Sequence, residues 1–179
     1  MPSSSPARAS SSAHDRAVDT NERADDEPAA TPPPSGSVRL PDGCVIQARG
    51  LRRPRPDGPP PDFGLFLGST RLRRRHDPTL TWPRDWIDWP DFWVPRDTEA
   101  AVSAITGVHE RARRGQSVEV ACDGGVGRTG TVIACLAVLA GVPPREAVPW
   151  ARRHHHRHAV ETPWQRRWVG SFAARVARA

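Results

Sequence analysis

The segment "VEVACDGGVGRTGT", residues 118–131, contains the pattern on which the fold of this chain depends. Its beginning, together with Ser117, alternates valine with other residues and predicts a strand over 117–121. A glycine-rich loop follows over 122–128, and the nearly all-apolar run from Thr129 to Ala140 predicts a buried helix. Loops between a strand and a helix N-terminus bind phosphate in several unrelated protein classes. The segment therefore predicts an anion-binding loop.

Three phosphate-binding patterns can be compared with this loop. The nucleotide loop G-x-x-x-x-G-K-[ST] is excluded, because Thr131 occupies the lysine position and the chain contains no lysine. The dinucleotide pattern G-x-G-x-x-G matches residues 125–130, but the region around Trp150 predicts a helix where a second strand ending in an acid is required. The pattern that remains is Cys-x5-Arg, from Cys122 to Arg128.

The residue types of this pattern suit a phosphate site with a nucleophile. Glycines allow the backbone to curl so that successive N–H groups point inward. The guanidinium of Arg128 matches two phosphate oxygens, and the helix N-terminus adds a favourable dipole. Cysteine in such a positive, donor-rich site favours the thiolate, so Cys122 is predicted to be a nucleophile. The residues predicted to contact phosphate are Asp123, Gly124, Gly125, Val126, Gly127 and Arg128.

Three segments together resemble the cysteine-dependent protein tyrosine and dual-specificity phosphatases. "CDGGVGRTG" (122–130) resembles the signature loop of that superfamily, and "WPDFWVP" (89–95) resembles its mobile acid loop. "ETPWQ" (161–165) resembles its Gln-Thr-x-x-Gln segment. The segments occur in the order that the superfamily has, and the resemblance covers roughly residues 40–176. We expect a bacterial member.

The resemblance implies a metal-independent reaction with no cofactor on a phosphoprotein or phosphopeptide. It implies that Cys122 attacks phosphorus and forms a phosphocysteine, while Arg128 and the loop amides stabilise the phosphoryl oxygens. Asp91 would protonate the leaving group and later deprotonate the attacking water. The hydroxyl of Thr129 would donate to the sulfur, and Gln165 would orient the water.

The chain departs from the superfamily pattern at two positions. Ala121 replaces the usual histidine before the nucleophile, and Glu161 replaces the first glutamine of the third segment. These departures leave a phosphate-binding pseudophosphatase module as an alternative. A phosphoinositide phosphatase is another, although residues 123–127 contain no cation for a polyphosphorylated headgroup. Asp85 and Asp88 are alternative acids.

The expected fold is α/β, with a central mixed sheet flanked by helices, as in protein tyrosine phosphatases. Residues 1–36 are rich in Ser, Pro, Ala and charge, and predict a disordered leader before a phosphatase domain over 37–179. Strands are predicted over 43–51, 63–69 and 117–121. Helices are predicted over 97–114, 129–140, 144–153 and 163–178, and Pro149 is expected to kink the third of them. Residues 71–95 are predicted to be loops.

Charge and cysteine content restrict the remaining function classes. The net charge of +6 comes from scattered arginines without a recognition motif, so we expect no nucleic-acid partner. No apolar run is long enough to span a bilayer, and we expect no membrane partner. Three sparse cysteines suit a reducing cytoplasm, and we expect a monomer. "HHHRH" (154–158) is interpreted as a solvated helix end.

Overall fold

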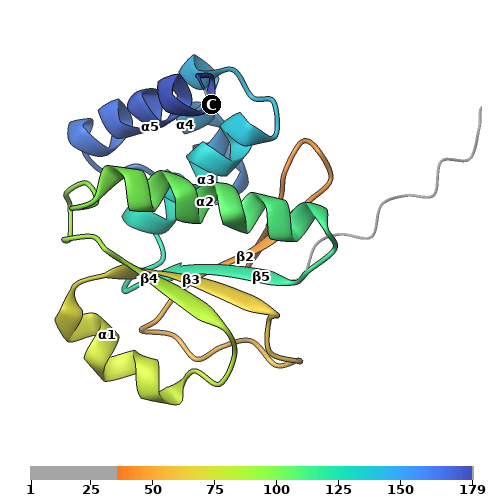
Figure 1. Cartoon of the computed structure of the whole chain (residues 1–179), viewed down its shortest axis with the longest axis vertical. Coiled ribbons are helices and arrows are strands. Elements are labelled where there is room, and N and C mark those ends of the chain that lie inside the picture. Colours follow the sequence, from red (N-terminus) through yellow and green to blue (C-terminus); the bar gives the residue numbers. More distant parts are fainter. Residues whose placement is uncertain (1–35, 179) are drawn as a thin grey trace, which may run out of the picture. The chain divides into compact units, whose positions relative to one another are not determined.

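A computed structural model describes residues 36–178 of the chain, and the predicted leader lies outside the described residues except for Gly36 (Figure 1). In this part of the chain, five strands form one mixed sheet in the order β1-β2-β5-β3-β4. The strands are β1 (Ser37–Arg39), β2 (Val45–Gly50), β3 (Phe63–Gly68), β4 (Arg84–Asp88) and β5 (Val118–Cys122). The expected α/β class is confirmed.

The strand before the glycine-rich loop lies in the middle of the sheet. β5 pairs in parallel with β2 on one side and with β3 on the other. All of its residues are buried, which is typical of a parallel strand covered on both faces. One of them, Glu119, forms a close ion pair with Arg49 of β2, with 2.6 Å between Oε1 and Nε. The carboxyl ends of three parallel strands therefore meet at one edge, where ligands bind in such sheets.

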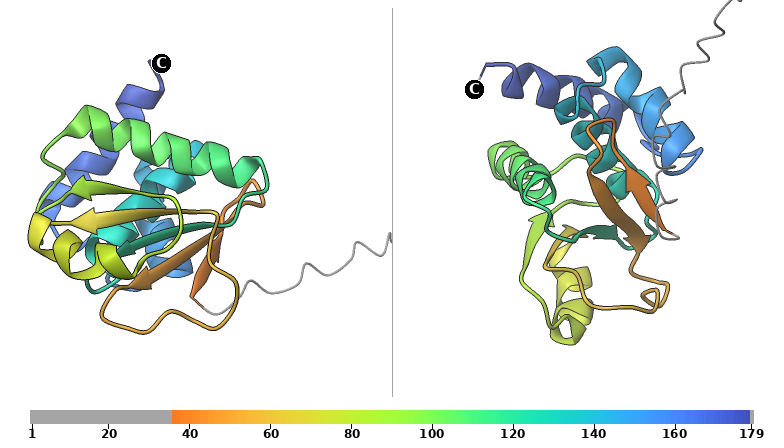
Figure 2. Two further views of the ribbon diagram at one scale, coloured as in Figure 1. Left: turned by 60° about the horizontal axis from the view of Figure 1, so that its bottom comes forward. Right: turned by 90° about the vertical axis from the view of Figure 1, so that its right-hand side faces the viewer.

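Helices cover both faces of the sheet. Figures 1 and 2 show α2, α3, α4 and α5 over one face and α1 on the other. The main core lies between the sheet and the four helices, and a smaller cluster that includes Phe66 and Leu80 lies beside α1. The helices are α1 (Thr70–His76), followed by a 3₁₀ turn η1 (Asp77–Thr79), α2 (Thr98–Arg113), α3 (Gly127–Leu139), α4 (Pro144–His154) and α5 (Pro163–Val176).

The strand and the helix that flank the glycine-rich loop both extend further into the loop sequence than predicted, so the loop itself is shorter. β5 ends at Cys122, and α3 begins at Gly127 rather than at Thr129. No side chain caps the start of α3, and Val126 is its N-cap residue. The first-turn N–H groups of α3 therefore have no side-chain cap and lie beside the loop.

The prediction of loops over residues 71–95 was wrong, because this region contains α1, η1 and β4. Ser69 caps α1 through its hydroxyl, which accepts the N–H of Leu72 at 3.4 Å. β4 is an edge strand that pairs in parallel with β3 and buries only Ile87. A short strand with one buried side chain gives no apolar alternation over several residues, so the sequence did not reveal it. The three-residue β1 was missed for the same reason.

The last two helices agree with the sequence in most respects. Thr162 and Gln165 form a capping box at the start of α5, with Pro163 in the first turn. Trp164, which follows in the same turn, is an exposed side chain. α4 continues through Pro149 to His154 as one helix.

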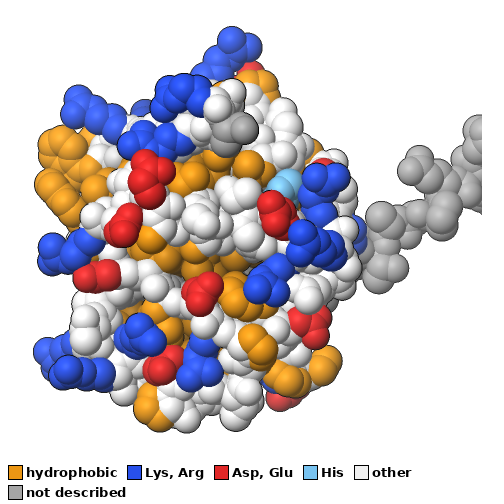
Figure 3. All heavy atoms as spheres, viewed as in Figure 1, with side chains coloured by type: hydrophobic (Ala, Val, Ile, Leu, Met, Phe, Trp, Pro, Cys, Tyr) orange, Lys and Arg blue, Asp and Glu red, His pale blue; other side chains and the backbone are white. Residues whose placement is uncertain are grey.

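On the face drawn in Figure 3, arginines alternate with acidic side chains, and that face has no continuous basic surface. In the described part of the chain, no helix has both the length and the apolar character that crossing a membrane requires.

Candidate active site

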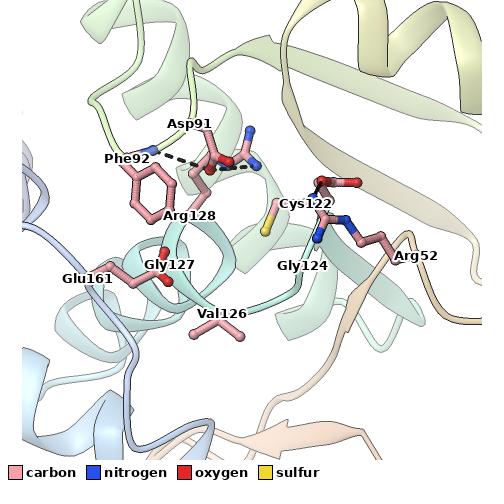
Figure 4. A pocket seen from close by; sticks show the side chains of 10 residues that line it. Arg52, Asp91, Phe92, Cys122, Gly124, Val126, Gly127, Arg128 and Glu161 are labelled. Atoms are coloured by element: carbon pink, nitrogen blue, oxygen red, sulfur yellow. Dashed lines mark hydrogen bonds and ion pairs between the residues drawn. The ribbon is translucent and has the colours of Figure 1, made fainter.

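A pocket opens at the carboxyl end of β5, where the sequence predicted an anion site (Figure 4). Four segments that are far apart in sequence contribute its walls: the residues after β2, the acid loop, the glycine-rich loop and the residues before α5. The lining residues are Arg52, Asp91, Phe92, Cys122, Asp123, Gly124, Val126, Gly127, Arg128 and Glu161.

The sulfur of Cys122 lies at the base of this pocket. Cys122 is only 2% exposed, and its Sγ points toward the loop that follows it. The N–H of Gly125 donates to this sulfur over 3.2 Å. The loop thus curls around Cys122 in the way that the glycines predicted.

Gly125 allows the loop to pack tightly against β2. Its φ is +75°, and a Cβ at this position would lie 2.4 Å from the backbone nitrogen of Gly50. Any side chain here would be both strained and blocked. Gly125 itself does not line the pocket, in contrast to its neighbours Gly124 and Val126. Its role is to bring the loop backbone close to the sheet.

His155 supports the loop from behind, which the sequence analysis did not anticipate. Its Nε2 lies 2.9 Å from the carbonyl oxygen of Gly125, and burial lowers the pKa of its imidazole. A neutral ring can donate Nε2–H to this carbonyl, which turns the oxygen away from the pocket. The interpretation of residues 154–158 as a solvated helix end was therefore wrong for His155.

Arg128 connects the glycine-rich loop with the acid loop. Its guanidinium is 6% exposed and lines the pocket. Nη1 donates to the carbonyl oxygen of Trp89 at 3.1 Å, and Nη2 lies 3.0 Å from Oδ1 of Asp91. The side chain is thus fixed by the acid loop, with the remaining N–H groups available in the pocket.

The acid loop has a buried anchor and an exposed tip. Trp89 is fully buried and donates through Nε1 to the carbonyl oxygen of Trp93 at 2.8 Å. Asp91 and Phe92 follow at the tip, and Phe92 has a φ of 55°, which is unusual for a bulky residue. Asp85 and Asp88, the alternative acids, do not line the pocket, although Asp91 does.

Glu161 brings a second carboxylate into the pocket. A Cβ on Gly127 would lie 1.8 Å from Oε2 of Glu161, so this glycine leaves room for the carboxylate. Burial, followed by the nearby charge of Asp91, raises the pKa of Glu161. Its departure from the superfamily pattern was the signal that marked this residue in the sequence.

Arg52 and Phe92 are pocket residues that the sequence analysis did not select. Arg52 forms an ion pair with Asp123 at the mouth of the pocket. Asp123, which was predicted to contact phosphate, lines the pocket, and its carboxylate holds the Arg52 cation there. Nothing in the local sequence distinguishes Arg52 from the many other arginines, whereas Phe92 lies beside the predicted acid.

Two predicted catalytic residues do not line the pocket. Thr129 is fully buried, and its hydroxyl forms no hydrogen bond with any described residue, including Cys122. Gln165 is also fully buried, and its Oε1 accepts the backbone N–H groups of Glu161 and Thr162 at 2.8 and 3.4 Å. In this geometry Gln165 shapes the backbone that carries Glu161.

Comparisons with known proteins agree with this geometry. Residues 90–171 match the family model described as "PTP-SAK: Swiss Army Knife protein, DSP-PTPase phosphatase domain". "Putative tyrosine phosphatase 067L" of Invertebrate iridescent virus 3 is 29% identical over 92 residues. This match spans 47% of the chain and 38% of the viral protein, which is well under two thirds of the latter.

Two solved structures have a similar fold. Tk-PTP in its active form is 24% identical, with a TM-score of 0.62, covering 79% of this chain and 98% of that one. Kinase associated phosphatase with its catalytic-site cysteine replaced by serine is 15% identical, with a TM-score of 0.62. The match covers 84% of this chain and 99% of that one. Residues 90–171 therefore resemble a dual-specificity protein tyrosine phosphatase domain in sequence, and the fold of the described residues is that of the solved phosphatases.

Proposed function

We propose that this protein hydrolyses phosphomonoesters through a phosphocysteine intermediate, with phosphotyrosine proteins or peptides as its main substrates. One observation carries the proposal: a buried cysteine sulfur, a guanidinium and a carboxylate face the same pocket. These are the nucleophile, the charge-stabilising group and the acid that phosphoryl transfer to sulfur requires.

In the first step, the thiolate of Cys122 attacks the phosphorus atom of the bound ester. The S–P bond forms as the bond from phosphorus to the leaving oxygen breaks. Arg128 and the loop N–H groups stabilise the charge on the three other oxygens. Asp91 gives its proton to the leaving oxygen, so the product departs as a neutral phenol or alcohol.

Substrate binding also changes the partner of Arg128. Without a ligand, one nitrogen of its guanidinium is paired with Asp91 at 3.0 Å. A phosphate dianion would replace this carboxylate, because it offers two oxygens to the same planar donors. The released carboxylate of Asp91 takes up a proton from solvent, and the resulting carboxyl group faces the leaving oxygen.

In the second step, water attacks the phosphorus atom of the phosphocysteine. Asp91, now a carboxylate, accepts a proton from the water as the new P–O bond forms. The S–P bond breaks, and the electron pair returns to Cys122 as the thiolate. Inorganic phosphate leaves, and the starting protonation states of Cys122 and Asp91 are restored.

Phe92 favours an aryl phosphate over an alkyl phosphate. This ring lines the pocket beside Asp91 and is 58% exposed, so a substrate ring can pack against it. Trp93 and Trp164, also exposed, lie next to each other with ring centroids 5.5 Å apart. Figure 3 shows hydrophobic side chains gathered at the edge where α5 and the start of α2 lie. Such a surface suits an apolar peptide segment beside the phosphorylated residue.

The proposal also covers the setting of this activity. We infer that residues 37–179 are the catalytic domain, with residues 1–36 as a leader, and that the enzyme acts as a bacterial cytoplasmic monomer. The three cysteines are free thiols, which a reducing compartment preserves. Residues 123–127 contain no cation for a phosphoinositide headgroup, and this favours a phosphoprotein.

The test is a phosphatase assay of the full chain on a phosphotyrosine peptide, with EDTA present. We expect turnover in EDTA and a fall of about 10⁴–10⁶-fold in Cys122→Ser, because serine is a far weaker nucleophile and the catalytic groups act as a unit. Cys135→Ser is the matched control, since Cys135 is a buried thiol of α3 outside the pocket. It should retain turnover in its folded fraction.

Four outcomes would contradict the proposal. Strict dependence on an added metal would exclude the thiol mechanism. Equal turnover in Cys122→Ser would exclude the nucleophile. Phosphopeptide binding without turnover would show a phosphate-binding pseudophosphatase, and turnover of phosphoinositide vesicles alone would show a lipid phosphatase.

A further inference from the structure

Three side chains with metal-binding atoms meet at the end of the sheet opposite the pocket. Asp42 lies in the turn between β1 and β2, Cys44 directly precedes β2, and His109 is on α2. One ligand atom from each lies within 4.8 Å of the other two. β2 separates this cluster from the active-site edge by its six residues, or about 20 Å.

The cluster is already organised by hydrogen bonds. Nε2 of His109 lies 2.7 Å from Oδ2 of Asp42. The other oxygen of this carboxylate, Oδ1, accepts the backbone N–H of Cys44 at 3.2 Å. The imidazole is buried on the core-facing side of α2, so both its position and its partner are fixed. A backbone donor that orients a ligating carboxylate is typical of metal sites.

We propose that Asp42, Cys44 and His109 bind a zinc ion, with water as the fourth ligand. Sulfur, imidazole nitrogen and carboxylate oxygen are the three ligand types that zinc takes in proteins. Zn–S and Zn–N bonds place tetrahedral neighbours about 3.5 Å apart, so shifts of about 1 Å would complete the geometry. Asp42 is exposed and lies in a turn, where such a shift is possible.

The ligand set distinguishes zinc from the common hard cations. Magnesium and calcium prefer oxygen ligands, whereas this site has one thiol and one imidazole. The ion would take the place of the proton that now joins His109 to Asp42. A thiolate and a carboxylate together balance the charge of the ion, which offsets the repulsion from nearby Arg113.

The ion would have a structural role. It would join the turn after β1 to α2, two segments that are 67 residues apart at Asp42 and His109. Since the site lies at the far end of β2, its loss should lower stability and leave the chemistry of the pocket intact. The inference is therefore independent of the proposed function.

The test uses Co²⁺ as a spectroscopic probe on the full chain carrying Cys122→Ser, which removes the active-site thiol. We expect one equivalent of Co²⁺ to give a thiolate-to-metal charge-transfer band and the d–d bands of four-coordinate cobalt, and Zn²⁺ to displace it. Cys44→Ser should abolish the charge-transfer band. Asp42→Asn, an isosteric change at an exposed residue, removes a direct ligand. It should weaken Co²⁺ affinity by at least about 10–100-fold, which is the usual cost of removing an outer-shell partner.

Two matched controls give the result its specificity. Cys135→Ala should retain the band, because Cys135 is inside α3. His156→Ala should also retain it, which excludes binding by the histidines after α4. As a second readout, Zn²⁺ should raise the Tm of the parent and not that of Cys44→Ser. A parent without the band, or a band that survives in Cys44→Ser and Asp42→Asn, would overturn the proposal.

Discussion

The glycine-rich loop and the acid loop form the same pocket in opposite ways. Cys122 and Arg128 are 2% and 6% exposed, and they lie where a buried strand and a buried helix meet. Asp91 has a side chain that is 54% exposed, and the loop is anchored at its two ends, by buried Trp89 and by buried Pro95. The first loop is held by the fold, and the second is held by a few contacts.

The glycine-rich loop is therefore a preorganised part of the site, whereas the position of the acid loop depends on its contacts with Arg128. Donors that are fixed before substrate arrives cost no reorganisation during the reaction. The acid loop instead depends on Arg128, through one carbonyl and one carboxylate. We therefore expect substitutions in the glycine-rich loop to weaken transition-state stabilisation, and substitutions in the acid loop to remove the acid or to displace it.

Of the substitutions that test this comparison of the two loops, Asp91→Asn should have the largest effect on turnover. We expect kcat on a phosphotyrosine peptide to fall about 10²–10⁴-fold, because general acid catalysis is lost, with little change in KM. Steady-state kinetics across pH would also show the loss of the acid from the rate profile. Asp88→Asn and Asp85→Asn are the controls, since neither residue lines the pocket. A large loss in either control would move the acid role away from Asp91.

Arg128→Lys tests the residue that joins the two loops. The charge remains, but the planar fork that matches a phosphate and contacts Trp89 is lost. We expect kcat/KM to fall about 10²–10³-fold, as when a charge-stabilising donor is removed. Arg52→Lys should retain most of the activity, because Arg52 is an exposed residue at the pocket mouth. Equal losses of kcat/KM in the two variants would show that buried Arg128 contributes no more to catalysis than exposed Arg52.

Phe92→Ala addresses the tip of the acid loop alone. We expect the preference for aryl over alkyl phosphates to fall about 2–10-fold, the cost of one aromatic contact. The ratio of kcat/KM on phenyl phosphate to that on an alkyl phosphate measures it. Trp164→Ala, another exposed aromatic, should leave this ratio unchanged. An unchanged ratio in Phe92→Ala would mean that this ring does not contact the substrate.

Glu161→Gln gives the smallest expected effect and a pH dependence of known sign. The raised pKa of Glu161 keeps its neutral form to a higher pH than is usual for glutamate. Above that pH the carboxylate repels a phosphate dianion, and below it the repulsion disappears. We expect Glu161→Gln to lower KM about 2–5-fold at high pH and to have little effect at low pH. A constant ratio of KM values across pH would show that Glu161 does not repel the substrate.

The sequence predicted the glycine-rich loop well because its residues are contiguous. Cys122, three glycines and Arg128 lie within seven residues, so spacing alone fixes how they can be arranged. The acid loop was predicted as a motif, but the strand before it was not. β4 is stabilised by pairing with β3, a non-local contact that local pattern does not record.

Long-range contacts explain what the sequence did not show in the site. His155 contacts Gly125 across 30 residues, and Arg52 contacts Asp123 across 71. Gln165 was expected to orient the water, and the described geometry places its side chain in the capping box of α5. The cluster of Asp42, Cys44 and His109 lacks any local metal-binding spacing, because the turn and the helix meet only in the folded chain.

The order of strands in the sheet has a consequence for biosynthesis. β5 lies between β2 and β3, yet the ribosome makes it after both. These two strands do not pair with each other in the native sheet, so the β1–β2 pair and the β3–β4 pair can join into one sheet only after residues 118–122 are made. We therefore expect nascent chains shorter than this to expose apolar strand edges and to need chaperone protection, and folding to be late and cooperative rather than progressive.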